Sequence, residues 1–237
     1  MHCENKQYET SGNCPVCKMK LIATTRSATS EASTQKPFTI CFYLQDNVEV
    51  LDFAGPLEVF TAAGFNVFTV SKTQKPIHSQ GVLTVVPEFS IENAPAANMM
   101  VFFGGGHGSP STDPAVINWI KSRVNTTDYF MSVCTGAFIM GRAGILDGLS
   151  ATCYQAQLDN LQKALPKTTV LRGVRVVDNG RVLSTAGVSA GIDGAIYFVS
   201  KVKGEAYGQY VADLIEYDKY APNEGLVIAK NEQTRPQ

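Results

Sequence analysis

From residue 38 onward, short runs of apolar residues alternate with amphipathic segments. The runs are rich in β-branched and aromatic residues, which is typical of buried strands. We expect strands at 38–44, 65–71, 99–103, 129–133 and 149–153. A hairpin of 173–178 with 180–186 is also predicted, because Asp178-Asn179-Gly180 is a strong turn signal.

Helical periodicity fills the segments between these strands. Pro56 is placed to begin a short helix that Gly64 ends. Further helices are predicted at 115–124, from 137 onward, and at 155–165, 188–202 and 205–217. Because strands alternate with helices, we expect an α/β fold with a mainly parallel sheet covered on both faces.

The first 22 residues form a separate, cysteine-rich segment. Its candidate metal ligands are His2, Cys3, Cys14 and Cys17. Thiolate and imidazole suit zinc, copper or another soft metal, and Cys-x-x-Cys on a turn is a usual half-site. A redox role for this Cys-x-x-Cys is the weaker alternative, because no βαβ pattern surrounds the motif. The other alternative is an unstructured tail in which the cysteines are incidental. Residues 23–36, rich in Ser, Thr and Ala, predict a flexible linker that ends before Pro37.

Composition narrows the function classes. The chain has 237 residues and a net charge of -1, which gives no electrostatic case for nucleic acid. No apolar run is long enough to span a membrane. The first residues are polar and carry no signal-peptide core, so we expect a cytoplasmic protein. The six cysteines are too scattered for a disulfide scaffold.

Residues 128–143 hold the candidate reactive residue, Cys134. The apolar run 129–133 ends there, and Thr135-Gly136 leads into a helix that begins with small residues. A nucleophile at such a turn projects beside unpaired N–H groups at the helix N-terminus, which favour the reactive thiolate. The alternative is a small apolar core residue, since free cysteines are often buried.

Two further features follow predicted strands, where sites gather in parallel α/β folds. Asp52 lies between two apolar residues. It is either a carboxyl with a raised pKa near the thiol, or an acid that caps a helix starting at Pro56. The glycine run 104–106 is either an ordinary tight loop or a source of backbone N–H groups for a substrate oxygen.

Four stretches resemble the ThiJ/PfpI superfamily, a branch of the type 1 glutamine amidotransferase-like fold, and most of all its isonitrile hydratase-like branch. They are VLDFAGPLEVF at 50–60, the glycine run, SVCTGAFIMGRAGILDG at 132–148 and STAGVSAGID at 184–193. The resemblance implies a flavodoxin-like three-layer α/β/α sandwich over 37–220, with 221–237 as a C-terminal tail. It also implies a homodimer that acts on a small-molecule substrate without a cofactor.

The resemblance implies roles for single residues. Cys134 matches the family's nucleophile, Asp52 the acid that hydrogen-bonds it, and Thr135 the residue after the cysteine that the hydratases also need. The backbone N–H groups of Gly106 and Thr135 would form an oxyanion-binding pair, with Gly105 beside them.

The chain also departs from the family pattern. Tyr154 stands where some relatives have a catalytic histidine. His107, beside the glycine run, is placed to reach the site instead, or is a loop residue that caps backbone groups. Gly104 replaces a usual proline, which is expected to loosen the loop without removing its N–H donors.

The N-terminal segment resembles the heavy-metal-binding module of metal efflux proteins. The matching positions are Met1-His2, Gly12, Cys14-Pro15, Cys17, Met19 and Leu21. Lys18 stands where the module has glycine, and the Cys-Pro expected before Met1 is absent. We therefore expect the chain to start inside a longer reading frame, and an upstream signal sequence would make the protein periplasmic.

Three functional hypotheses follow. The leading one is a cysteine-dependent hydro-lyase or hydrolase, with hydration of an isonitrile to an N-substituted formamide as the specific reaction. In the second, Cys134 is a redox sensor in an oxidant or metal response. In the third, the main domain is a ligand-binding scaffold and the N-terminal segment is the functional metal site.

Overall fold

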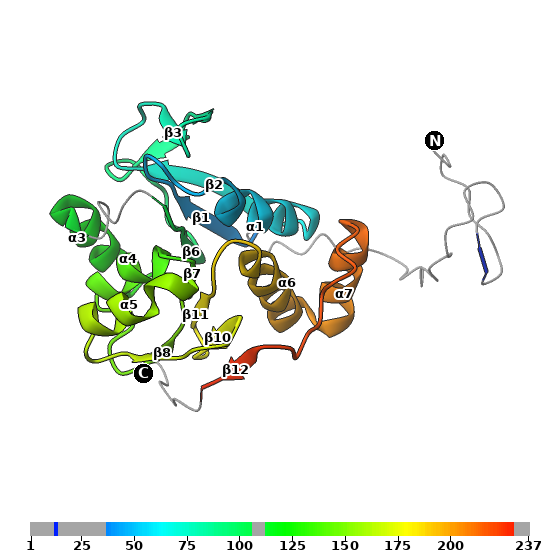
Figure 1. Ribbon diagram of the computed structural model, residues 1–237. Helices are drawn as coiled ribbons and strands as arrows, with labels where there is room; N and C mark the ends of the chain where they lie inside the picture. Colours follow the sequence, from blue (N-terminus) through cyan, green and yellow to red (C-terminus); the bar gives the residue numbers. More distant parts are fainter. Residues whose placement is uncertain (1–11, 14–36, 106–111, 230–237) are drawn as a thin grey trace. The chain divides into compact units, whose positions relative to one another are not determined.

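The computed structural model describes residues 12–13, 37–105 and 112–229 (Figure 1). The chain divides into two units, Met1–Lys36 and Pro37–Gln237. The predicted metal segment and linker therefore lie almost wholly outside the described residues. The second unit carries the fold, and none of its described helices is long and apolar enough to cross a membrane.

An eight-stranded sheet runs through this unit in the order β12-β10-β11-β7-β6-β1-β2-β5. Its strands are β1 Thr39–Tyr43, β2 Asn66–Ser71, β5 Phe89–Ser90, β6 Met99–Phe102, β7 Tyr129–Val133, β10 Val176–Asp178, β11 Val182–Thr185 and β12 Leu226–Ile228. Every neighbouring pair is parallel except the hairpin of β10 with β11. The mainly parallel sheet is confirmed, and so is the hairpin predicted around Asn179-Gly180.

Helices cover both faces of the sheet (Figure 1). One face carries α1 Val50–Ala62, α6 Ala190–Lys203 and α7 Glu205–Leu214. The other face carries α3 Pro114–Arg123, α4 Gly136–Arg142 and α5 Leu158–Ala164. A 3-10 turn, η2 Gln155–Gln157, precedes α5. Each layer buries its own apolar cluster against the sheet. Along β1, Phe42 packs on one side while Cys41 and Tyr43 pack on the other, as the two-residue repeat of a strand requires. The predicted three-layer α/β/α sandwich is confirmed.

Four short strands lie outside the large sheet. β3 Ile77–Ser79 and β4 Leu83–Val85 form an antiparallel pair. β8 Ser150–Ala151 pairs in parallel with β9 Thr169–Val170, so the strand predicted at 149–153 belongs to a separate ladder. β12, in the stretch expected to be a loose tail, pairs with β10 at the edge of the large sheet.

The predicted start of the first helix is wrong. The helix begins at Val50, and Pro56 lies inside it. A proline lacks the N–H that would bond the carbonyl four residues back, which here is the carbonyl of Asp52. Because the helix starts earlier, Asp52 lies in its first turn and faces the sheet as a buried residue.

Candidate active site

Cys134 lies at a sharp turn between β7 and α4. Its backbone has φ of +58°, in the left-handed region that L-residues rarely adopt, and the side chain is only 6% exposed. The Cys134 N–H donates to the Ala186 carbonyl at 3.2 Å, which ties the turn to the end of β11. A Cβ on Gly136 would lie 2.2 Å from the Phe102 oxygen, so the turn requires glycine there. The predicted strand-to-helix elbow is present.

Asp52 reaches the elbow from α1 and is fully buried. Its Oδ2 accepts a hydrogen bond from the Gly104 N–H at 2.8 Å, and its Oδ1 accepts one from the Val188 N–H at 3.2 Å. The carboxyl also hydrogen-bonds the Cys134 thiol. Three chain segments, after β6, β7 and β11, therefore converge on this one carboxyl.

The two acidic groups hold one proton between them. Burial raises the pKa of Asp52 to about 6, although hydrogen bonds from Gly104 and Cys134 oppose the rise. Burial, and next the charge of Asp52, raises the pKa of the Cys134 thiol. At neutral pH the stable form is thus a carboxylate beside a thiol. As expected, the N–H group of Thr135 at the helix end favours the thiolate, and so does that of Val188, but burial and the Asp52 charge outweigh both and the pKa of the thiol is raised.

Val188 is a site residue that the sequence did not indicate. It has φ of +53°, which is a strained conformation for a β-branched side chain. In this conformation its N–H points at Asp52 and also favours negative charge on the Cys134 sulfur. Val188 lies in the stretch 184–193 that resembles the family, but its own residue type gives no signal, since valine is a poor residue for the left-handed region and the contact is tertiary.

Gly104 is wedged between the thiol and the carboxyl. A Cβ at this position would lie 2.7 Å from Asp52 Oδ2 and 2.8 Å from Cys134 Sγ. The Gly104 carbonyl accepts from the Glu49 N–H at 3.1 Å and from Gln45 Nε2 at 3.2 Å. Both the N–H and the carbonyl of Gly104 are therefore hydrogen-bonded, and the expected loosening of the loop is not observed at this residue.

Thr135 and Gly105 join the elbow to the glycine run. The Gly105 N–H donates to Thr135 Oγ1 at 3.3 Å. Gly105 has φ of +85°, and a Cβ there would lie 2.3 Å from the Asn47 oxygen. The Thr135 N–H lies against the Cys134 sulfur and opposes the rise of its pKa. The other predicted members of this loop, Gly106 and His107, lie outside the described residues.

Tyr154 lies near the site but is not joined to it by any hydrogen bond among the described residues. Its side chain is 45% exposed, and its ring packs where a Cβ on Gly187 would be, 2.7 Å from Cδ2. Tyr154 thus contacts the segment that carries Val188. No described contact gives it the proton-handling role of the family's histidine.

The predicted metal ligands His2, Cys3, Cys14 and Cys17 all lie outside the described residues. Within the part of the chain that the structure describes, no three His, Cys, Asp or Glu side chains are grouped to hold a metal ion. Cys41, Cys134 and Cys153 are buried free cysteines.

Comparison with known families supports both resemblances seen in the sequence. Residues 38–202 match the DJ-1/PfpI family, and residues 1–24 match the heavy metal binding domain.

Two relatives differ in how similar they are to this chain and in how much of their own length the similarity covers. An isonitrile hydratase of Pseudomonas putida is 32% identical over 187 residues, which cover 77% of this chain and 80% of the hydratase. The HTH-type transcriptional regulator GbdR of Pseudomonas aeruginosa is 22% identical over 192 residues, 78% of this chain but only 52% of the regulator.

Solved structures share the fold. A THiJ/PfpI family protein from Pseudomonas syringae has a TM-score of 0.73 at 24% identity, with 83% of this chain and 85% of that chain covered. DJ-1beta of Drosophila melanogaster has a TM-score of 0.68 at 16% identity, with 76% and 98% covered.

Proposed function

Because the chain belongs to the DJ-1/PfpI family, we propose that it is a cysteine-dependent hydro-lyase or hydrolase of a small molecule. Cys134 is the nucleophile and Asp52 the base. The observation that carries the proposal is the fully buried Asp52 carboxyl, which hydrogen-bonds the thiol and has a pKa of about 6. A base with that pKa is ionised at neutral pH and close enough to take the thiol proton as the sulfur attacks.

Isonitrile hydration is the specific reaction we propose, on the strength of the Pseudomonas putida relative. The sulfur attacks the terminal carbon of R–N≡C, and Asp52 passes the thiol proton to that carbon to give the thioimidate R–N=CH–S–Cys. Water then adds across the C=N bond. The carbon–sulfur bond breaks and the proton returns to the thiol, which releases the formamide R–NH–CHO.

The surrounding backbone groups have separate roles in this proposal. The N–H groups of Gly104 and Val188 hold Asp52 against the thiol. The N–H groups of Thr135 and Gly106 bind the oxygen of the water adduct, as an oxyanion-binding pair would. We propose a homodimer as the working assembly.

Replacement of Cys134 tests the proposal. With a panel of aliphatic and aromatic isonitriles, Cys134→Ala is expected to lose formamide production by at least about a thousandfold and to keep its circular dichroism spectrum. Cys41→Ala is the matched control, because Cys41 is a buried cysteine of β1 that packs in the opposite core and is expected to keep full activity. Full activity in Cys134→Ala would end the proposal.

A redox-sensor role for Cys134 has less support. Oxidation to sulfenic acid proceeds through the thiolate, and the pKa of Cys134 is raised. The N-terminal match to the heavy metal binding domain is the observation that favours a metal-response role. Measurement of the intact mass after mild peroxide treatment separates the sensor from the enzyme. Stoichiometric oxygen addition at Cys134, with no turnover of any isonitrile, would favour sensing.

We also propose that the N-terminal segment binds a soft metal, zinc or copper, through His2, Cys3, Cys14 and Cys17. The support is the donor set itself, three thiols and an imidazole, together with the family match over residues 1–24.

A further inference from the structure

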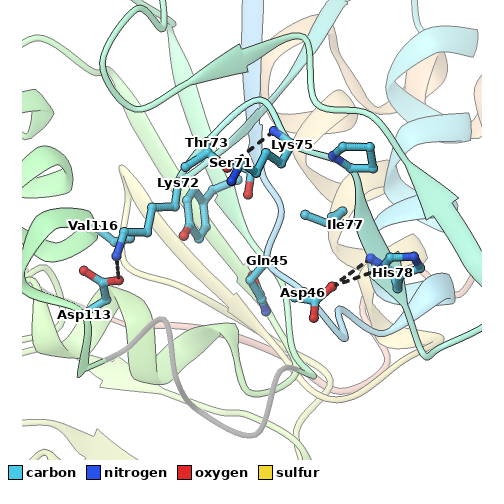
Figure 2. Close-up of a pocket in the computed structure, with 12 residues that line it drawn as sticks. Gln45, Asp46, Ser71, Lys72, Thr73, Lys75, Ile77, His78, Asp113 and Val116 are labelled. Carbon is cyan, nitrogen blue, oxygen red and sulfur yellow. Dashed lines mark hydrogen bonds and ion pairs between the residues drawn. The ribbon is translucent and has the colours of Figure 1, made fainter.

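A cavity of about 390 Å³ lies at the carboxyl ends of β1 and β2. Its walls come from residues 43–46, residues 71–78 and the start of α3 (Figure 2). We call it the β1–β2 cavity. Neither Cys134 nor Asp52 lines it. Its volume is in the range of small-molecule sites and is many times the roughly 30 Å³ that one water occupies in the liquid.

Gln45 gives this cavity a buried acceptor that needs a donor. The side chain is only 5% exposed. Its Nε2 donates to the carbonyls of Phe103, at 2.8 Å, and Gly104, at 3.2 Å, which fixes the orientation of the amide. Oε1 then has no hydrogen-bond partner among the described residues. An unpaired buried acceptor is costly and rare in native proteins, so this atom points to a ligand donor.

Two buried residues with hydroxyl groups also line the cavity. Tyr43 and Ser71 are 2% and 5% exposed, and both line the cavity. Burial, and next the charge of Asp113, raises the pKa of Tyr43, so its hydroxyl keeps its proton and can donate. Each hydroxyl can donate a hydrogen bond to a ligand oxygen.

The charges around the cavity leave one cation for a ligand. Lys72 is paired with Asp113 at 2.5 Å, and Asp46 accepts the His78 N–H at 2.8 Å (Figure 2). Lys75 also lines the cavity and forms no ion pair with any described residue. The cavity is therefore lined by a lysine without an ion pair among the described residues, by two residues with hydroxyl donors, and by Gln45 with its unpaired acceptor.

We propose that the β1–β2 cavity binds a small carboxylate that carries an N–H donor beside the acid, such as an N-acylamino acid. The ligand N–H donates to Gln45 Oε1. Its carboxylate accepts from the hydroxyls of Tyr43 and Ser71 and pairs with the Lys75 ammonium. Because no atom of Cys134 or Asp52 is needed, this binding does not depend on turnover at Cys134.

A set of matched ligands tests each part of the recognition. N-acetylglycine, titrated by calorimetry into the full chain, is expected to bind. N-acetyl-N-methylglycine lacks the donor and N-acetylglycinamide lacks the negative charge, and each is expected to bind on the order of tenfold more weakly. Equal binding of all three compounds, or no binding of N-acetylglycine at millimolar concentration, would overturn the proposal.

Protein variants locate the binding. Lys75→Ala is expected to weaken N-acetylglycine binding on the order of tenfold, while Lys163→Ala, at an exposed lysine of α5, leaves it unchanged. Ser71→Ala is expected to weaken it as well. Binding is expected to persist in Cys134→Ala. Loss of binding in Cys134→Ala together with unchanged binding in Lys75→Ala would show that the ligand binds at the candidate active site. That result would refute binding in the β1–β2 cavity.

Discussion

The Val188 N–H donates a 3.2 Å hydrogen bond to Oδ1 of Asp52 across 136 positions of sequence. Val188 can do so only because its φ is +53°. Strained backbone of this kind persists where the surrounding structure enforces it, and it gathers at functional sites. The Val188 N–H on Oδ1 and the Gly104 N–H on Oδ2 together fix the carboxyl that contacts the thiol. The proposed chemistry therefore depends on groups that hold Asp52 as much as on Asp52 itself.

Asp52→Asn is expected to separate thiol reactivity from turnover. The Asp52 charge raises the pKa of Cys134, so removing it lowers that pKa and speeds alkylation by iodoacetamide at neutral pH. Turnover falls instead, by about a hundredfold or more, because the base is lost. The measurement is the pH dependence of alkylation, with Cys134→Ala included because any labelling that remains in it comes from the other five cysteines. Slower alkylation in Asp52→Asn would mean that Asp52 is a neutral donor.

Gly104→Ala is expected to damage the site more than the fold. The new Cβ would overlap both Asp52 Oδ2 and Cys134 Sγ, so the thiol and carboxyl must move apart. We expect a loss of about a hundredfold in turnover, with destabilisation of roughly 1–3 kcal/mol in urea. Gly64→Ala is the control: it has φ of +74° and no atom within 4 Å, so it costs stability without touching the site. Equal turnover in both variants would contradict this prediction.

The sequence predicted most of the sheet because its strands are apolar on both faces. The runs that became β1, β6 and β7 need no tertiary information, and Asn179-Gly180 specifies its hairpin locally. The elbow at Cys134 was predicted for the same reason: a buried run meets small residues at a helix start.

What the sequence could not predict depends on contacts between distant segments. Pro56 suggested a helix start, yet the helix runs on through it, and Gly55 lies tight against Ile192 of α6. The raised pKa of Cys134 comes from burial and from Asp52, neither of which the local helix-end argument includes. The sequence does not mark Gln45, because its side-chain oxygen is left unpaired only by the contacts that its Nε2 makes with the distant carbonyls of Phe103 and Gly104.

Stability is expected to change with pH through Asp52. Its pKa in the folded state is raised from 3.8 to about 6, so the folded state binds the proton more tightly than the unfolded state. The charged carboxyl therefore destabilises the fold above pH 6, and this penalty disappears as the pH falls towards 4. Relative to Asp52→Asn, wild type should gain roughly 2 kcal/mol in the free energy of unfolding between pH 7 and pH 4. Urea titrations of both proteins measure this difference, and a constant or opposite difference would refute the raised pKa.

Loss of the Cys-x-x-Cys pair is expected to remove metal without affecting the proposed reaction. Two thiolates are half of a four-ligand site, so a Cys14→Ser/Cys17→Ser variant should lose its zinc on desalting after zinc loading, measured by mass spectrometry of the metal. Cys41→Ala/Cys153→Ala is the matched control, since both cysteines are buried in the main unit. Alkylation of Cys134 should be the same in all three proteins. If the Cys14→Ser/Cys17→Ser variant keeps as much zinc as wild type, the N-terminal segment is not the metal site, and the match over residues 1–24 reflects sequence likeness alone.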